Sequence, residues 1–134
     1  MKTNTDIRYL VTIFLVLISN NILASSYYKC SIMASYDLTD TGLLKREKTV
    51  SPAYDNFTID RKTGIFRQSI IDTKLRVVTV GSKDELFRAV LSSPNRNEWD
   101  MLLTIREYSD TKLKPYILFR NMSTVIDTGK CEKF

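Results

Sequence analysis

The chain has 134 residues, with 20 Lys and Arg, 15 Asp and Glu, no histidine and a net charge of +5. This length fits one domain of ordinary size. The absence of histidine excludes a Ser-His-Asp triad, a Cys-His catalytic pair and a histidine-ligated zinc site. Because the charges are interspersed rather than gathered into a dense basic patch, nucleic acid is not an expected partner.

The N-terminal segment has the three parts of a secretory signal peptide. Lys2 and Arg8 supply positive charge, an apolar core follows at 9–18, and small residues lie at 24–26. A helix that spans a bilayer needs about 20 apolar residues, and this core is about half as long. The pattern therefore predicts a cleaved leader rather than a membrane anchor.

We expect cleavage after Ala24, with cleavage after Ser26 as the alternative. This divides the chain into a signal peptide over 1–24 and a single secreted all-β domain over 25–134. No other stretch is apolar and long enough to cross a membrane, so we expect no transmembrane segment after cleavage.

The two cysteines of the chain, Cys30 and Cys131, lie near opposite ends of this domain. Cysteines of exported proteins usually pair, because the compartments outside the cytoplasm oxidise thiols. We therefore predict a Cys30–Cys131 disulfide and a periplasmic or secreted location; a free reactive thiol is the disfavoured alternative. A disulfide that closes a loop of about 100 residues stabilises the fold by roughly 4–5 kcal/mol in the chain-entropy model.

Short β-strands dominate the expected domain. The segments are rich in Val, Ile, Thr, Tyr and Phe, and turn residues separate them roughly every eight to twelve positions. The expected strands cover 27–35, 43–49, 57–60, 65–71, 75–80, 99–108, 114–120 and 124–131. These are about eight short strands with short connections.

A tight hairpin is expected between 57–60 and 65–71. Gly64 ends the loop between these strands, and glycine adopts the positive φ of such a turn without steric cost.

A short helical turn is expected at Ser82, because Glu85 follows at the spacing of a capping box. Residues 86–91 then either continue the helix or, as we favour, form a strand.

Taken together, the strands predict an all-β fold in which an antiparallel meander closes as a small barrel or a flattened sandwich. Pairing 27–35 with 124–131 would remove both sheet edges. The Cys30–Cys131 disulfide would fasten the seam between these terminal strands.

Few side chains are available for catalysis. Two carboxylate pairs, Asp55 with Asp60 and Glu98 with Asp100, have the residue type that glycosidases use. Acids at loop and strand ends are ordinary surface, so we predict no catalytic residues and no enzyme activity, with a carboxylate-based hydrolase as the alternative. The turn aspartates lack the spacing of a calcium loop, so we expect no metal ion and no cofactor.

Arg96 and Trp99 are the predicted contact residues for a partner. Trp and Arg are enriched at interfaces, and both residues lie at an expected loop–strand junction. The structural alternative is that Trp99 covers the core. We expect a monomer whose partner is an unknown protein or envelope component.

The segments Tyr28–Cys30, Phe57–Gly64, Lys114–Tyr116 and Thr128–Cys131 resemble those of small, uncharacterised exported bacterial β-proteins. The resemblance covers most of the domain and implies a β-fold in a periplasmic or secreted protein. More distantly, the N-terminal Tyr-x-Cys and the C-terminal cysteine resemble the C-type lysozyme inhibitors of bacterial periplasms, which are small antiparallel barrels. That family inserts a Ser-Gly-x-x-Tyr loop into the lysozyme cleft, and this chain has no such loop.

The sequence thus favours a non-enzymatic exported binding or envelope-associated protein. The alternative implied by the second resemblance is an inhibitor of an extracellular enzyme such as lysozyme.

Overall fold

The structure, a computed structural model, describes residues 26–47, 55–92, 100–121 and 124–134. These residues form one antiparallel sheet of ten strands. The strands are β1 Tyr27–Leu38, β2 Leu44–Arg46, β3 Asn56–Asp60, β4 Ile65–Gln68, β5 Ile71–Lys74, β6 Arg76–Ser82, β7 Glu85–Leu91, β8 Met101–Ile105, β9 Lys114–Arg120 and β10 Val125–Lys133. The described residues contain no helix with the length and hydropathy needed to cross a bilayer.

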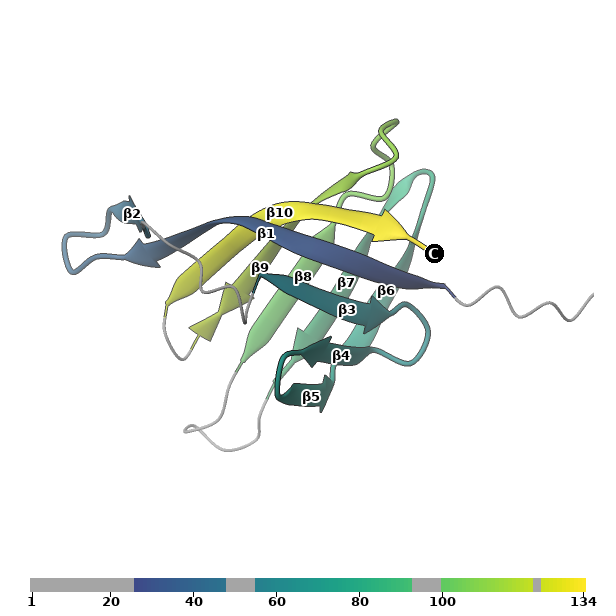
Figure 1. Cartoon of the computed structure of the whole chain (residues 1–134), viewed down its shortest axis with the longest axis horizontal. Coiled ribbons are helices and arrows are strands. Elements are labelled where there is room, and N and C mark those ends of the chain that lie inside the picture. The colour runs from purple at the N-terminus through teal and green to yellow at the C-terminus, as the bar shows by residue number, and fades with distance from the viewer. Residues whose placement is uncertain (1–25, 48–54, 93–99, 122–123) are drawn as a thin grey trace, which may run out of the picture.

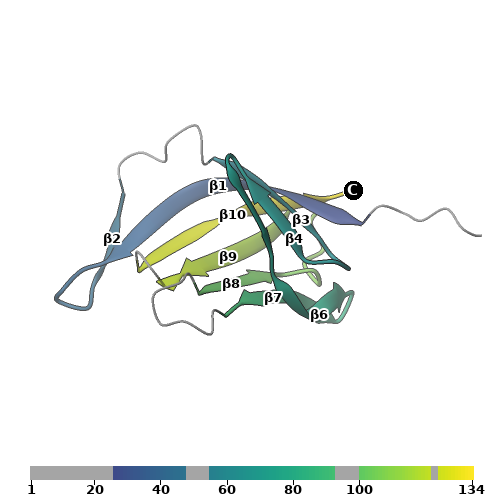
Figure 2. The same cartoon turned by 90° about the horizontal axis from the view of Figure 1, so that it is seen from below.

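The sheet curls until it is nearly closed into a barrel (Figures 1 and 2). Its strand order is β5-β4-β3-β1-β10-β9-β8-β7-β6, and β2 pairs with β1 outside this path. The predicted all-β fold is therefore confirmed, in the form of a curled sheet. The first and last strands pair as predicted, but they lie in the middle of the strand order.

The two edges of the sheet come from the middle of the chain. β5 and β6 are the last strands of the order, and only Leu75 separates them in sequence. Leu75 is buried, and its N–H donates to the carbonyl oxygen of Gly64 at 2.9 Å. The chain therefore passes directly from one edge strand to the other at Leu75. The prediction that pairing of the terminal strands removes both sheet edges is wrong, because β1 and β10 lie in the middle of the strand order.

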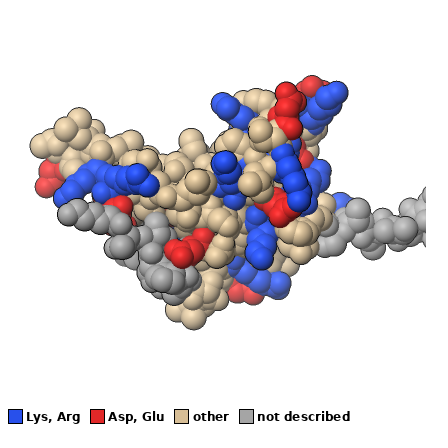
Figure 3. All heavy atoms as spheres, turned by 45° about the horizontal axis from the view of Figure 1, so that its top comes forward, with Lys and Arg blue, Asp and Glu red and all other residues tan. Residues whose placement is uncertain are grey.

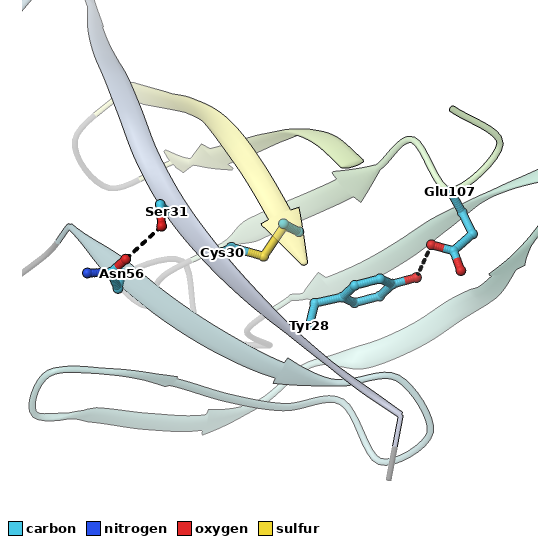
Figure 4. The surroundings of a disulfide bond; sticks show 6 residues. Tyr28, Cys30, Ser31, Asn56 and Glu107 are labelled. Carbon is cyan, nitrogen blue, oxygen red and sulfur yellow. Dashed lines mark hydrogen bonds between the residues drawn. A yellow bond between two sulfur atoms is a disulfide. The ribbon is translucent and has the colours of Figure 1, made fainter. Parts of the chain in front are cut away.

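The β1–β10 pair carries the disulfide. Cys30 lies directly opposite Cys131 in the register, and the two sulfur atoms are bonded (Figure 4). Beyond them, Tyr27 and Phe134 exchange two backbone hydrogen bonds of 3.2 and 2.9 Å, and their rings stack with centroids 5.4 Å apart. The predicted disulfide and its place on the seam of the terminal strands are confirmed.

The core is built from apolar side chains that occupy every second position of the strands and point inward. In β8, for example, Met101, Leu103 and Ile105 are buried, whereas Leu102 between them is exposed. The interior is filled by Tyr28, Cys30, Phe57, Ile59, Phe66, Leu75, Phe87, Ala89, Met101, Leu103, Ile105, Tyr116, Leu118 and Cys131. Each large apolar side chain buried in this way contributes about 1.5–3 kcal/mol of transfer free energy.

β1 and β10 approach unusually closely at Gly129. The register of the pair shifts between Ile32 and Ala34, and Gly129 lies opposite Ile32. A Cβ atom added to Gly129 would lie 1.9 Å from the carbonyl oxygen of Ser31 and 2.9 Å from Cε1 of Tyr116. Only a residue without a side chain fits this position.

The expected single strand over 65–71 is wrong. The structure divides it into β4 and β5, which are joined by a turn at Ser69 and Ile70. Ser69 has a φ of 50°, and Gln68 pairs directly with Ile71. Ile70 is 89% exposed, so the apolar Ile70–Ile71 pair concealed the turn.

The expected helical turn at Ser82 is also wrong. Ser82 pairs with Glu85 across a two-residue hairpin turn, and its hydroxyl accepts the N–H of Asp84 at 3.2 Å rather than capping a helix. Serine stabilises such turns through this kind of hydrogen bond. The favoured strand over 86–91 is confirmed within β7.

Candidate interaction surface

The structure does not describe the predicted contact residues. Arg96 and Trp99 fall within 93–99, outside the described residues, and Glu98 lies in the same range. The proposed contact therefore stays a prediction, as does the Glu98–Asp100 pair.

The other carboxylate pair is not brought together. Asp55 and Asp60 flank opposite ends of β3, which separates them by about 17 Å at the rise of an extended strand. The Asp60 carboxylate accepts the N–H groups of Thr63 and Lys62 at 2.7 and 2.9 Å, which lowers its pKa. Asp60 thus holds the β3–β4 turn. Within the described ranges, no three His, Cys, Asp or Glu residues could together hold a metal ion.

A charge network around the buried Glu107 joins both ends of the described chain, and Figure 4 shows its Tyr28–Glu107 hydrogen bond. The Tyr28 hydroxyl donates to Oε2 of Glu107 at 2.7 Å, and Nζ of Lys133 donates to Oε1 at 2.9 Å. A guanidinium nitrogen of Arg61 lies 3.5 Å from the same Oε1. Arg61 also donates to the carbonyl oxygens of two residues at the end of β6 and lies over the Tyr28 ring. The network therefore ties β1, β10, the β3–β4 turn and β6 together around Glu107.

This environment shifts both acidic groups. Burial disfavours ionisation of Glu107, but the hydrogen bonds from Tyr28 and Lys133 and the charges of Lys133 and Arg61 outweigh it, so its pKa lies below the ordinary value. Burial, and then the hydrogen bond to Glu107, raise the pKa of the Tyr28 hydroxyl. At neutral pH the carboxylate is charged and the phenol is neutral.

We expect Glu107→Gln to lower the free energy of unfolding at pH 7 by about 2 kcal/mol, because it leaves Arg61 buried without its counter-charge. The depressed pKa of Glu107 makes this stabilisation complete above about pH 5, and it is lost as pH falls through the folded-state pKa. Urea unfolding at a series of pH values measures the difference between the two proteins, which should shrink toward pH 3.

Asp72→Asn is the matched control. It removes the Arg67–Asp72 ion pair, in which both side chains are 64% exposed, so it should change stability by less than about 0.5 kcal/mol. A Glu107→Gln deficit that is equally large at pH 3 and pH 7 would contradict the assigned role.

A second buried charge, Asp127, lies farther along β10. Its carboxylate accepts the Ser35 hydroxyl and pairs with the Arg120 guanidinium at 2.6 Å. Asp127 is 2% exposed. Burial of the Tyr116 hydroxyl, and then the negative charge of Asp127, raise the pKa of that hydroxyl. These contacts place the Asp127 charge in a structural ion pair.

Part of the outer surface of the sheet is apolar, where a fully solvated surface would be polar. One row of aligned, outward-facing side chains crosses five neighbouring strands from β7 to β1, and Ile117 lies beside it on β9. We call this set the outer apolar face: Val90, Leu102, Phe119, Ile126, Tyr36 and Ile117. Leu102 is 43% exposed, Ile117 54% and Phe119 36%, and the other three are half-buried.

A groove of about 370 Å³ adjoins the outer apolar face and shares Ile117 with it. Its other lining residues are Leu86, Thr104, Arg106, Tyr108, Pro115 and Tyr116. The Arg106 guanidinium lies over the Tyr108 ring, 5.4 Å from its centroid. The groove thus combines an apolar wall with an aromatic–arginine pair, the residue types that dominate binding energy at interfaces.

The row ends at Tyr36, since the residue registered opposite it on β2 is Arg46. A separate apolar pair lies farther along β1, on the β1–β2 hairpin, which extends beyond the body of the barrel (Figures 1 and 2). Leu38 and Leu44 pair across it and are 49% and 55% exposed. The hydroxyl of Thr39 donates to the Leu43 carbonyl oxygen and accepts the Leu43 N–H, which orders the tip.

The sequence contains a signal for this surface in the pattern of two strands rather than in any single residue. An antiparallel strand with one solvated face alternates between apolar and polar residues. β8 (MLLTI) and the centre of β9 (YILF) instead have apolar residues at outward positions as well.

Comparisons of the chain with protein-family models, with curated proteins and with solved structures find no match.

Proposed function

We propose that this protein is a non-enzymatic exported protein that binds a partner protein outside the cytoplasm through the outer apolar face. The observation that carries the proposal is the aligned row of apolar side chains across five strands. Contiguous exposed apolar surface beside a groove is typical of protein interaction sites.

A periplasmic or secreted location is part of the proposal. Disulfides persist mainly in oxidising compartments, and the Cys30–Cys131 bond is compatible with such a location. The leader expected over 1–24 supports the same location from the sequence.

We expect Ile117→Glu to abolish capture of the partner, because it places a charge where the outer apolar face meets the groove. The bait is the protein purified in oxidised form after expression of the full chain, and the sample is an envelope or extracellular extract of the source cells. Captured proteins are quantified by mass spectrometry, and the expected loss exceeds tenfold for about 1.4 kcal/mol or more of lost binding energy.

Ile70→Glu is the matched control, since it makes the same change at an exposed isoleucine in the β4–β5 turn, on the opposite half of the sheet order. It should leave capture unchanged. Equal capture by both variants would refute the proposed surface. If the captured partner is an enzyme such as lysozyme and its activity falls stoichiometrically, the protein is an inhibitor, the alternative form of the proposal.

A further inference from the structure

The groove beside the outer apolar face has a positive rim. Arg106 lines it directly. Arg88 is paired across strands with the lining residue Thr104, and Lys130 is paired with the lining residue Pro115. All three cations are exposed, and none makes an ion pair with a described residue.

Among the described residues at the groove, no carboxylate balances this charge. Its lining residues include none, and the residues registered opposite Thr104, Pro115 and Ile117 include none. Glu132, farther along β10, is paired with Lys112 at 2.5 Å. Figure 3 shows one face of the molecule, on which Lys and Arg cover more of the described surface than Asp and Glu.

Charge argues against a second copy of this chain as the occupant. Two such grooves facing each other would bring their cationic rims together, and like charges across an interface oppose association. The rim instead complements an anionic partner, whereas the wall formed by Leu86 and Ile117 complements apolar side chains.

We propose that the groove binds an acidic segment of the partner protein that also carries aliphatic or aromatic side chains. This inference rests on the proposed function and specifies its partner class. Carboxylates of the segment pair with Arg88, Arg106 and Lys130, and an apolar side chain packs against Ile117. The exposed cations accelerate association and make binding dependent on salt.

The test uses the full oxidised protein and three short synthetic peptides. The peptides share the same Leu and Phe residues and differ only in that the intervening positions are all Glu, all Gln or all Lys. Binding is measured by fluorescence anisotropy. The Glu peptide should bind at least about tenfold more tightly than the Gln peptide, and its affinity should fall when ionic strength rises from about 0.05 to about 0.5 M.

Arg106→Gln and Lys130→Gln should each weaken binding of the Glu peptide several-fold. Lys74→Gln is the control, since this exposed lysine lies on β5, which does not line the groove and is paired with β4 in the sheet. Thermal unfolding of each variant verifies the fold.

Two results would overturn the inference: equal binding of the Glu and Gln peptides, or no binding of any peptide at millimolar concentration. Neither result alters the capture experiment with Ile117→Glu. Loss of capture in that variant without peptide selectivity would retain the proposed function and reject only the acidic partner class.

Discussion

Replacing Cys30 and Cys131 by alanine is expected to lower the free energy of unfolding by about 4–5 kcal/mol. The bond closes a loop with a sequence separation of 101 residues, so its main effect is to restrict the unfolded chain. A domain of this size has a total stability of about 5–15 kcal/mol, so the variant should be largely or partly unfolded at 37 °C. Urea unfolding followed by circular dichroism measures the loss.

Reduction provides the control for this prediction. Dithiothreitol should destabilise the native protein by about the same amount as the double substitution and should leave the double variant unchanged. A variant that unfolds at the same urea concentration as the native protein would show that the network around Glu107 and the β1–β10 hydrogen bonds hold the seam without the disulfide.

Gly129→Ala is expected to destabilise the fold by about 3 kcal/mol or more, because the methyl group has no room. Its Cβ would lie 1.9 Å from the Ser31 carbonyl oxygen, and a backbone atom of a paired strand cannot move aside as a side chain can. The central β1–β10 pair would have to separate at this point. Thermal and urea unfolding of the purified variant test the expectation.

Gly42→Ala separates this clash from the general effect of removing a glycine. Gly42 has a φ of +77°, but an added Cβ would meet nothing within 4 Å. Its replacement should therefore cost only about 1 kcal/mol, from the left-handed backbone conformation. If Gly129→Ala were as mild as Gly42→Ala, the close approach of the two strands would not be a feature of the folded protein.

The features that could be predicted from the sequence are those set by neighbouring residues or by a covalent bond. Gly64 has the expected positive φ, 73°, at the end of the β3–β4 turn. Segments rich in β-branched and aromatic residues correctly predicted the positions of most strands. The disulfide followed from the number and placement of the cysteines. Each of these features depends on a few neighbouring residues or on a covalent bond.

The sequence could not supply the features that depend on tertiary neighbours. Ser82 and Glu85 have the spacing of a helix cap, but strands on both sides favour a hairpin turn instead. Arg61 was expected only as a loop residue, whereas it is 8% exposed and bonds to carbonyl oxygens of β6. The outer apolar face likewise becomes visible only when the register aligns β7 to β10 with β1.

The central position of β1 and β10 has a consequence for the order of assembly. A chain that passes N-terminus first through an export channel, as we propose for this one, can form the β6–β9 meander while its C-terminal strand β10 is still in the channel. The sheet cannot be completed until β10 arrives, since the two bonded cysteines of β1 and β10 are separated by 101 residues in sequence. If the chain is exported in this way, as we propose, the Cys30–Cys131 disulfide can form only after β10 has left the channel.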